Sequence, residues 1–418
     1  MHNPMESQQT IGFLNHLTHK GNLKQTRYGW LRLTPAYSVH LVSDLLDTYQ
    51  EKPPIVLDPF CGTGTTVLVC AERGIESHTI DINPFLVWLT RAKTRSYETK
   101  EILTFEKVSN QVVETMLAAE VQAAWVPPLH QIEKWWDEQT LGVLSRAMWA
   151  INSIEKSISE NVADLLKVAF CRMMIEQANV SFGHQSMSFK KNRNGTSPML
   201  QILENQTITN WKRAVSTISQ AACSDVISQP HVLLGDARNL STKLEPNYYT
   251  CVITSPPYPN RMSYIRELRP YMYWLGYLKN ARDAGELDWK AIGGTWGCAT
   301  SNVGKWKPEY EVKIPFDGFY GVVERIGETS PLLSRYVHKY FYDMVQHSNE
   351  LFSVVKPGGS IHYIVGNSKF YDVVLPVESI FAGLFESVGF VNVSIHTIRK
   401  RSSKKELFEF VVSAQKPT

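Results

Sequence analysis

One short segment near the N-terminus constrains the fold more than any other. Residues 55–58 (IVLD) form an apolar run that ends in an acid, and the glycine-rich sequence PFCGTGT follows at once. Residues 65–74 then show a helical pattern that stops at Gly74, and a second apolar run, HTIDI, comes next at 78–82. A strand, a glycine turn, a helix and a second strand in this order predict a βαβ unit. We therefore expect an α/β fold built on a parallel sheet.

The strand pattern is interrupted and resumes in the second half of the chain. Further strands are predicted by the apolar runs at 231–237, 249–258 and 358–366. The tail beyond residue 390 predicts two strands joined by a basic turn, which would suit an antiparallel edge of the sheet. Between these halves, apolar residues recur at helical spacing.

This pattern divides the chain into three parts. We expect residues 1–99 to hold an N-terminal element and the first half of the sheet, and residues 100–228 to form a largely helical insertion that could carry target recognition. Residues 229–418 would hold the second half of the sheet, with an irregular insertion at 279–335 that is rich in glycine, tryptophan and charge. Three tryptophans are expected to pack the inserted helices: Trp135, Trp136 and Trp149.

Composition excludes some classes of protein but does not choose a function. The six cysteines contain no C-x-x-C pair, which argues against a structural zinc site and a disulfide framework, so no metal is expected. No apolar run reaches the length of a membrane span, and the first residues do not resemble a signal peptide, so we expect a cytoplasmic protein. The formal charge of +3 neither requires nor excludes a nucleic-acid partner.

The first half of the chain carries the features of a nucleoside site. A strand that ends in Asp58 and leads into a G-x-G turn lets a ligand touch the backbone, because glycine has no Cβ. Asp81, at the end of the next predicted strand, could accept hydrogen bonds from both hydroxyls of a ribose. Asp236, which ends a third strand, could accept from an adenine amino group.

Glycine turns of this kind also occur in dinucleotide-binding and phosphate-binding loops. A dinucleotide fingerprint needs a third glycine where this chain has Val67, and no G-K-[ST] of a phosphate-binding loop follows. Alternatively, the glycines only make a tight turn and Asp58 only caps a helix. The acids at matching strand ends favour the nucleoside site over this alternative.

The second half carries a sequence suited to methylating an amino group. Ser255, Pro256, Pro257 and Tyr258 follow an apolar strand, so they are predicted at the edge of the sheet where ligands bind. The Ser255 hydroxyl and the Pro256 carbonyl offer two acceptors for the hydrogens of a base's exocyclic amino group. The prolines stiffen the loop, and Tyr258 can stack on a base removed from its helix. The alternative is a proline-rich turn that ends a buried strand.

These motifs resemble those of the S-adenosylmethionine-dependent amino-methyltransferases of DNA. DPFCGTGTT is similar to the family's cofactor motif, TIDINP to its ribose-binding strand end and LLGDA to its adenine-contacting motif. SPPY is similar to the cytosine-N4 branch, whereas adenine-N6 members more often carry DPPY or NPPY. LTPAYSVHLV and VVKPGGSIHYIVGNS are similar to further elements of the family. The resemblance implies a Rossmann-like seven-stranded sheet with a reversed final strand.

The resemblance also implies a cofactor, partners and site residues. The cofactor would be S-adenosylmethionine, and the partners double-stranded DNA and a cognate restriction endonuclease. The implied catalytic residues are Ser255, Pro256, Pro257 and Tyr258. The implied cofactor-binding residues are Asp58, Phe60, Gly62, Gly64, Thr65, Asp81, Ile82, Asp236 and Ala237.

Basic residues in predicted loops are candidates for nucleic-acid binding, although charge runs are often only solvated. These candidates are Lys190, Lys191, Arg193, Arg261, Arg399 and Arg401. Taken together, the motifs favour a DNA cytosine-N4 methyltransferase of a restriction–modification system. The alternatives are an adenine-N6 DNA methyltransferase, an RNA guanine-N2 methyltransferase and a non-catalytic binder on the same scaffold. Carbon-5 methylation is disfavoured, because it needs a thiolate and the chain has no Pro-Cys pair.

Overall fold

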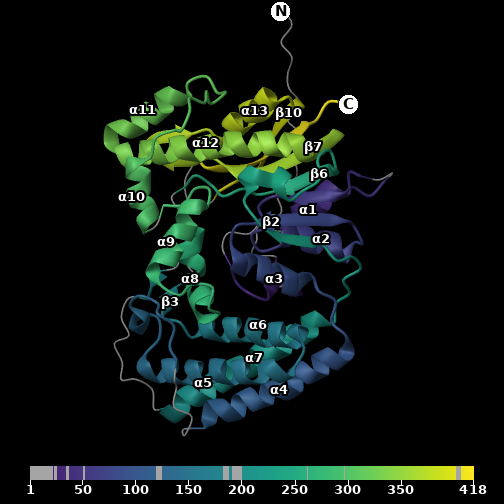
Figure 1. Ribbon diagram of the computed structural model, residues 1–418, viewed down its shortest axis with the longest axis vertical. Coiled ribbons are helices and arrows are strands. Elements are labelled where there is room, and N and C mark those ends of the chain that lie inside the picture. The colour runs from purple at the N-terminus through teal and green to yellow at the C-terminus, as the bar shows by residue number, and fades with distance from the viewer. Residues whose placement is uncertain are drawn as a thin grey trace, which may run out of the picture.

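The computed structural model (Figure 1) shows a sheet with helices on both faces and a separate group of helices beside it. It describes residues 22, 26–33, 37–49, 52–118, 125–181, 188–190, 200–260, 262–295, 297–401 and 406–418, with the backbone alone at 200–204.

Seven strands form the main sheet. They are β1 (Val56–Asp58), β2 (Ser77–Asp81), β5 (His231–Leu234), β6 (Tyr249–Thr254), β7 (Val355–Gly366), β10 (Val391–Lys400) and β11 (Phe408–Gln415). Their order is β10-β11-β7-β6-β1-β2-β5, and all neighbours are parallel except that β11 is antiparallel to both β10 and β7. The expected α/β fold, a Rossmann-like seven-stranded sheet with a reversed final strand, is confirmed.

Helices cover the two faces of this sheet because adjacent strand residues point to opposite sides. Leu57 packs into a core with α12 (Pro331–Val354) and α13 (Val377–Val388). Its neighbour Val56 packs into the other core, with α1 (Val39–Leu46) and α2 (Thr65–Glu72). The short central strands are therefore buried on both faces, which is typical of parallel sheets.

Four helices form a unit that we call the helical lobe, drawn below the sheet in Figure 1. They are α4 (Thr99–Leu117), α5 (Glu138–Ile154), α6 (Glu160–Glu176) and α7 (Leu200–Ala222). The lobe shares one hydrophobic core with α3 (Pro84–Thr94) and α8 (Tyr264–Trp274). These two helices therefore connect the lobe to the sheet.

Two of the three tryptophans expected in this core are found there. Trp135 and Trp136 are buried, which confirms their packing role. Trp149 is 48% exposed, so the prediction for it is wrong. The reason is helical geometry: Met148 and Ile151 lie on the buried face of α5, and Trp149 projects from another face.

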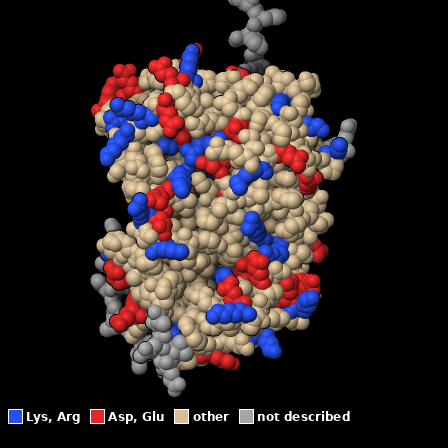
Figure 2. All heavy atoms as spheres, viewed as in Figure 1, with Lys and Arg blue, Asp and Glu red and all other residues tan. Residues whose placement is uncertain are grey.

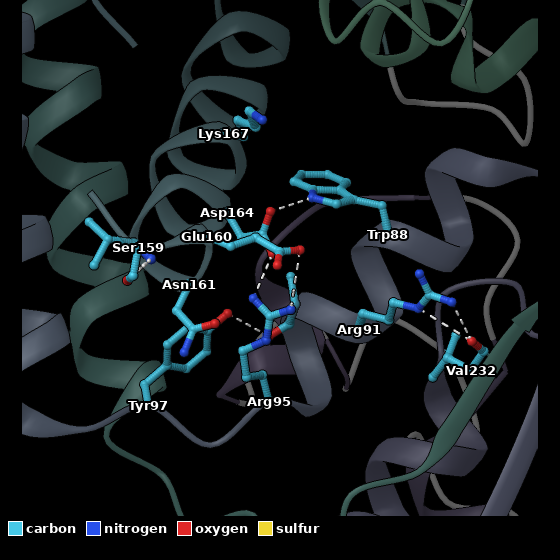
Figure 3. A network of polar contacts seen from close by, with 12 residues as sticks. Trp88, Arg91, Arg95, Tyr97, Ser159, Glu160, Asn161, Asp164, Lys167 and Val232 are labelled. Carbon is cyan, nitrogen blue, oxygen red and sulfur yellow. Dashed lines mark hydrogen bonds and ion pairs between the residues drawn. The ribbon is translucent and has the colours of Figure 1, made fainter. Parts of the chain in front are cut away.

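A polar network holds the lobe to α3 (Figure 3). The buried Asp164 of α6 accepts hydrogen bonds from Trp88 Nε1 at 2.7 Å and from Arg95 Nη1 at 2.8 Å. Glu160, one turn earlier, lies 3.7 Å from Arg95. Burial raises the pKa of Asp164, and its two donors oppose that rise. Because α3 begins just after the Asp81 strand end, this network fixes the lobe relative to that end of the sheet.

A buried arginine makes a second connection. Arg27 is fully buried and donates to the carbonyls of Ala221 and Ala222 at the end of α7. Its Nη1 donates to the carbonyls of Lys93, at the end of α3, and Arg95. Carbonyls at helix ends lack intrahelical donors and carry partial negative charge, so one guanidinium satisfies two helix ends at once.

The segment 279–335 is not the irregular insertion that the sequence predicts. It contains α9 (Ala281–Lys290), α10 (Cys298–Lys305) and α11 (Phe319–Thr329). Each helix is short, and glycines with positive φ at 293, 297 and 318 separate them, so no long periodic pattern forms in the sequence.

The remaining elements are small. They are the antiparallel pairs β3 (Val180–Ser181) with β4 (Ser188–Phe189) and β8 (Ser368–Phe370) with β9 (Val373–Leu375), and 3₁₀ turns at Arg27–Gly29, Ile132–Lys134, Glu155–Ser157 and Ala237–Thr242. Among the described residues, no helix has the length and apolar character needed to cross a membrane.

Candidate active site

A cavity of about 220 Å³ opens at the carboxyl ends of the central strands. It brings together residues that lie far apart in the sequence. The predicted residues that line it are Phe60, Gly62, Asp81, Ile82, Asp236, Ala237, Ser255, Pro256, Pro257 and Tyr258. Three predicted cofactor residues, Asp58, Gly64 and Thr65, do not appear in its wall.

The glycine loop forms the floor of one end of the cavity. Gly62 and Gly64 have φ values of +51° and +76°, which favour glycine. A Cβ on Gly64 would also lie 2.7 Å from the Thr90 hydroxyl oxygen. The buried Lys93 donates through Nζ to the Thr63 carbonyl at 3.0 Å. Gly64 and Thr65 thus shape the loop and start α2 without facing the cavity.

Asp58 lies behind this loop. It is fully buried, and its carboxylate accepts from the Thr254 hydroxyl at 2.6 Å, the Phe60 N–H at 3.1 Å and the Tyr37 hydroxyl at 3.1 Å. Burial raises its pKa to about 7, against the effect of these donors. Asp58 therefore ties the loop to the neighbouring strand β6 and to the segment before α1.

Asp81 faces the cavity from the end of β2. Its carboxylate accepts from the Gly62 N–H at 3.0 Å and the Asn83 N–H at 2.8 Å. Burial raises its pKa to about 6, and these backbone donors oppose the rise. The acid therefore holds the glycine loop and presents acceptor oxygens to the same cavity.

Asp236 lines the next part of the wall and is held by an arginine. Arg238 bonds both carboxylate oxygens of Asp236, with Nη2 at 2.6 Å from Oδ2 and Nε at 3.0 Å from Oδ1. The same guanidinium bonds Asp343 at 3.1 Å and the Lys290 carbonyl at 2.6 Å. Through Lys290, the segment 279–335 therefore helps to orient Asp236.

A buried histidine fixes the residue after Asp236. His347 bonds the Ala237 carbonyl through Nδ1 at 2.8 Å and the Tyr363 hydroxyl through Nε2 at 2.6 Å. Burial lowers the pKa of His347 to about 4, so the ring is neutral near pH 7. A carbonyl can only accept, so Nδ1 carries the proton. Its ring also lies 4.8 Å from that of Phe60, centroid to centroid.

Contacts from four elements hold the Ser-Pro-Pro-Tyr loop. The Ser255 hydroxyl donates to the Ile364 carbonyl of β7 at 3.0 Å. Tyr340 of α12 donates to the Pro257 carbonyl at 2.7 Å. The Tyr258 N–H donates to the hydroxyl of Tyr264 in α8 at 3.1 Å. Together with the prolines, these bonds fix the loop in one conformation.

The Tyr258 side chain reaches the fourth element. Its hydroxyl donates to Glu409 of β11 at 3.1 Å. Burial and this carboxylate hold the pKa of Tyr258 well above its usual range, so the hydroxyl stays protonated. Glu409, Arg399 and Arg401 all line the cavity. Sequence reasoning missed Glu409, Tyr340 and His347, because no local pattern connects them to the motifs that they support.

The predicted nucleic-acid contacts fall in different places. Arg399 and Arg401 lie in the cavity wall. Lys190 is exposed beside β4 and does not line the cavity. Lys191, Arg193 and Arg261 lie outside the described residues. Figure 2 shows basic and acidic side chains interspersed on the face in view.

One cysteine lies in the glycine loop itself. Cys61, in the glycine loop, is buried and contacts the Thr90 hydroxyl at 3.0 Å, and burial raises the pKa of its thiol. A thiol in this environment is not a ready thiolate nucleophile. Across the described ranges, no three His, Cys, Asp or Glu side chains are arranged to hold a metal ion.

Known proteins resemble this chain both locally and over most of its length. The family model N6_N4_Mtase, described as DNA methylase, matches residues 16–91. The type II methyltransferase M.BsoBI of Geobacillus stearothermophilus is 23% identical, over 92% of this chain and 82% of its own length. M.AvaI of Nostoc sp., also a type II methyltransferase, is 23% identical over 90% of this chain and 81% of its own length. Among solved structures, the rRNA methyltransferase aviRa from Streptomyces viridochromogenes covers 95% of this chain and 96% of its own, with 9% identity and a TM-score of 0.28.

Proposed function

Because this chain belongs to the S-adenosylmethionine-dependent amino-methyltransferases of DNA, we propose that it methylates N4 of cytosine in double-stranded DNA. We further propose that it serves as the modification enzyme of a restriction–modification system, with a cognate endonuclease as its partner. The single observation that carries the cytosine assignment is Ser255 at the head of the Pro-Pro-Tyr loop, because this position holds neither Asp nor Asn.

The geometry of Ser255 suits an acceptor of the amino hydrogen. Its hydroxyl donates its proton to the Ile364 carbonyl, so the lone pairs of Oγ can accept from another donor. Ser255 also lines the cavity. The lone pair of an exocyclic amino group is delocalised into the base, and acceptors on its hydrogens favour a tetrahedral, more nucleophilic nitrogen. Ser255 Oγ and the Pro256 carbonyl are the acceptors that we propose for this step.

The cavity fits the cofactor that the family uses. Asp81 offers carboxylate oxygens for ribose hydroxyls, and Asp236 offers one for an adenine amino group. A Cβ on Gly235 would lie 2.4 Å from Ile80 Cδ1, so the backbone before Asp236 packs closely against the Ile80 side chain of β2. S-adenosylmethionine, when bound, supplies an electrophilic methyl group. The residues of this chain would then orient the two partners and exclude water, and no covalent intermediate is needed.

Tyr258 is the residue that we propose for the target base. A base inside a duplex cannot reach a cavity of this kind, so it must leave the stack and bind against an aromatic ring. Tyr258 is held at its hydroxyl by Glu409 and at its N–H by Tyr264, so its ring is positioned before any base arrives.

The helical lobe and Lys190 are the parts that we propose for contacts with the rest of the duplex. The lobe is fixed to α3 by Arg95 and Asp164, so its surface has a set orientation relative to the cavity. Contacts to phosphates would make DNA binding strongly dependent on salt.

Nucleoside analysis tests the proposal directly. The purified protein is incubated with unmethylated genomic DNA and S-adenosylmethionine, and the digested nucleosides are measured by mass spectrometry. We expect N4-methylcytosine. N6-methyladenine as the product would retain the fold and cofactor but refute the cytosine assignment. Methylation of structured RNA in preference to duplex DNA would refute the DNA assignment.

A further inference from the structure

Three strand ends bring charged side chains beside Tyr258. Gly366, the last residue of β7, lies opposite Glu409 of β11, and Glu409 lies opposite Arg399 of β10. Because β11 runs antiparallel to its neighbours, its beginning meets their carboxyl ends at the edge where the cavity opens. Arg401, just past β10, joins this group in the cavity wall.

Glu409 is occupied on both carboxylate oxygens. Oε1 accepts from the Tyr258 hydroxyl at 3.1 Å, and Oε2 accepts from Arg399 Nε at 2.6 Å. Its side chain is only 12% exposed. The ion pair of Glu409 with Arg399 therefore positions the Tyr258 ring through the hydrogen bond to its hydroxyl.

Arg401 differs from Arg399 in its partners. Its Nη1 donates to the backbone carbonyl of Asn367 at 3.2 Å, and no carboxylate of the described residues forms an ion pair with it. Its guanidinium carbon lies 5.8 Å from the centre of the Tyr258 ring. A Cβ on Gly366 would lie 3.1 Å from Arg401 Nη1 and 2.9 Å from Tyr258 Cε2, so both side chains pack on the same glycine. Arg401 thus presents a charged fork in the cavity beside the ring proposed for stacking.

We propose that Arg401 is a specificity-determining residue that binds the O2 and N3 edge of the target cytosine. This inference rests on the proposed function. A flipped base is read on its Watson–Crick edge, and a guanidinium offers several N–H donors in a planar fork. Cytosine presents two adjacent acceptors, O2 and N3, beside its amino group. Adenine presents one ring acceptor, N1, beside its amino group and a C–H at the next position. A guanidinium at the position of Arg401 therefore favours cytosine over adenine.

The position of Arg401 also separates this role from a phosphate contact. A residue that only contacts DNA phosphates could lie anywhere on the DNA-binding surface. Arg401 instead lies in the same cavity wall as Ser255 and Tyr258. The charge of Arg401 is also held close to the ring on which the base would stack.

The test compares Arg401→Met and Arg401→Lys with Lys400→Met. Lys400 is the exposed neighbour on the same hairpin and does not line the cavity. Each full-length variant is assayed on unmethylated genomic DNA for kcat, for KM and for the change of DNA affinity with salt. Calorimetry with S-adenosylmethionine alone and the thermal midpoint verify that each variant is folded and binds cofactor.

We expect Arg401→Met to lower kcat/KM for DNA by roughly 5- to 150-fold, the range for losing one bidentate base contact. Arg401→Lys keeps the charge but not the fork, so it should lose nearly as much. Cofactor affinity and the salt slope should match those of Lys400→Met.

Two results would overturn this role for Arg401. One is activity of Arg401→Met equal to that of Lys400→Met. The other is a loss confined to DNA affinity with a salt slope smaller by about one, which would identify a phosphate contact. The product of the unmodified protein is a separate readout: N6-methyladenine there would refute the proposed function, whatever the variants do.

Discussion

Replacing Asp58 by Asn should make this protein more stable at alkaline pH. The carboxyl group is fully buried, and burial raises its pKa from 3.8 to about 7. An amide is neutral at every pH and nearly the same size. Its oxygen can keep the bonds from Thr254 and Phe60, and its NH₂ group can donate to the Tyr37 oxygen. The substitution therefore removes a buried charge while keeping the packing.

The sign and size of this effect on stability follow from the pKa of Asp58 in the unfolded chain and in the folded protein. The folded protein binds the Asp58 proton more tightly than the unfolded chain, so this group costs stability as the pH rises from about 4 to about 7. Over the whole pH range, the free energy of unfolding falls by about 4 kcal/mol, since one pKa unit is worth about 1.4 kcal/mol. Roughly 2–3 kcal/mol of it falls between pH 5 and pH 8.

Urea unfolding at pH 5 and pH 8 measures this effect. The free energy of unfolding of Asp58→Asn minus that of the unmodified protein should increase by roughly 2–3 kcal/mol from the lower to the higher pH. Asp372→Asn, which replaces a fully exposed carboxylate, is the matched control and should show no such increase. A difference for Asp58→Asn that is the same at both pH values would refute the reasoning.

Three further predictions concern the loop and the buried network. Ser255→Ala and Tyr258→Ala should each abolish most turnover while leaving cofactor affinity intact; full activity in both would contradict the proposed chemistry. Arg27→Met should lower the free energy of unfolding by about 3 kcal/mol or more, because it leaves carbonyls at two helix ends without donors, and urea titration would show this. His347→Phe should weaken S-adenosylmethionine binding about 5- to 10-fold in calorimetry, because Ala237 loses its donor, and an unchanged Kd would exclude this positioning role.

Local patterns in the sequence predicted the strands, the order of the motifs and the presence of the lobe helices. They worked because each of these features repeats within a few residues, as the run 55–58 and the glycine turn after it do. Asp58 was expected to bind the cofactor, and the structure places it behind the loop with three donors. A strand-end acid looks the same in sequence whether it faces a cavity or the core.

The rest of the site depends on contacts between distant residues. Glu409 meets Tyr258 across 151 positions, and only the pairing of β11 with β7 brings them together. Asp343 is likewise joined to Arg238, and His347 to Ala237, because α12 packs against the 3₁₀ turn Ala237–Thr242. Arg401 was expected to bind nucleic acid because the sequence around it is basic; strand register, which no local pattern reveals, brings Arg401 into the cavity wall.

The position of β11 inside the sheet has a consequence for how the chain is made. β11 is synthesised after β10, yet it lies between β10 and β7. Until residues 408–415 leave the ribosome, the β7 edge is without its partner, and a nascent chain with an open edge can pair with other strands. Over the same interval Glu409 is absent, so Tyr258 lacks the hydrogen bond that positions its ring. A chaperone that shields β7 during translation would therefore protect both the yield of the protein and the completion of the cavity wall.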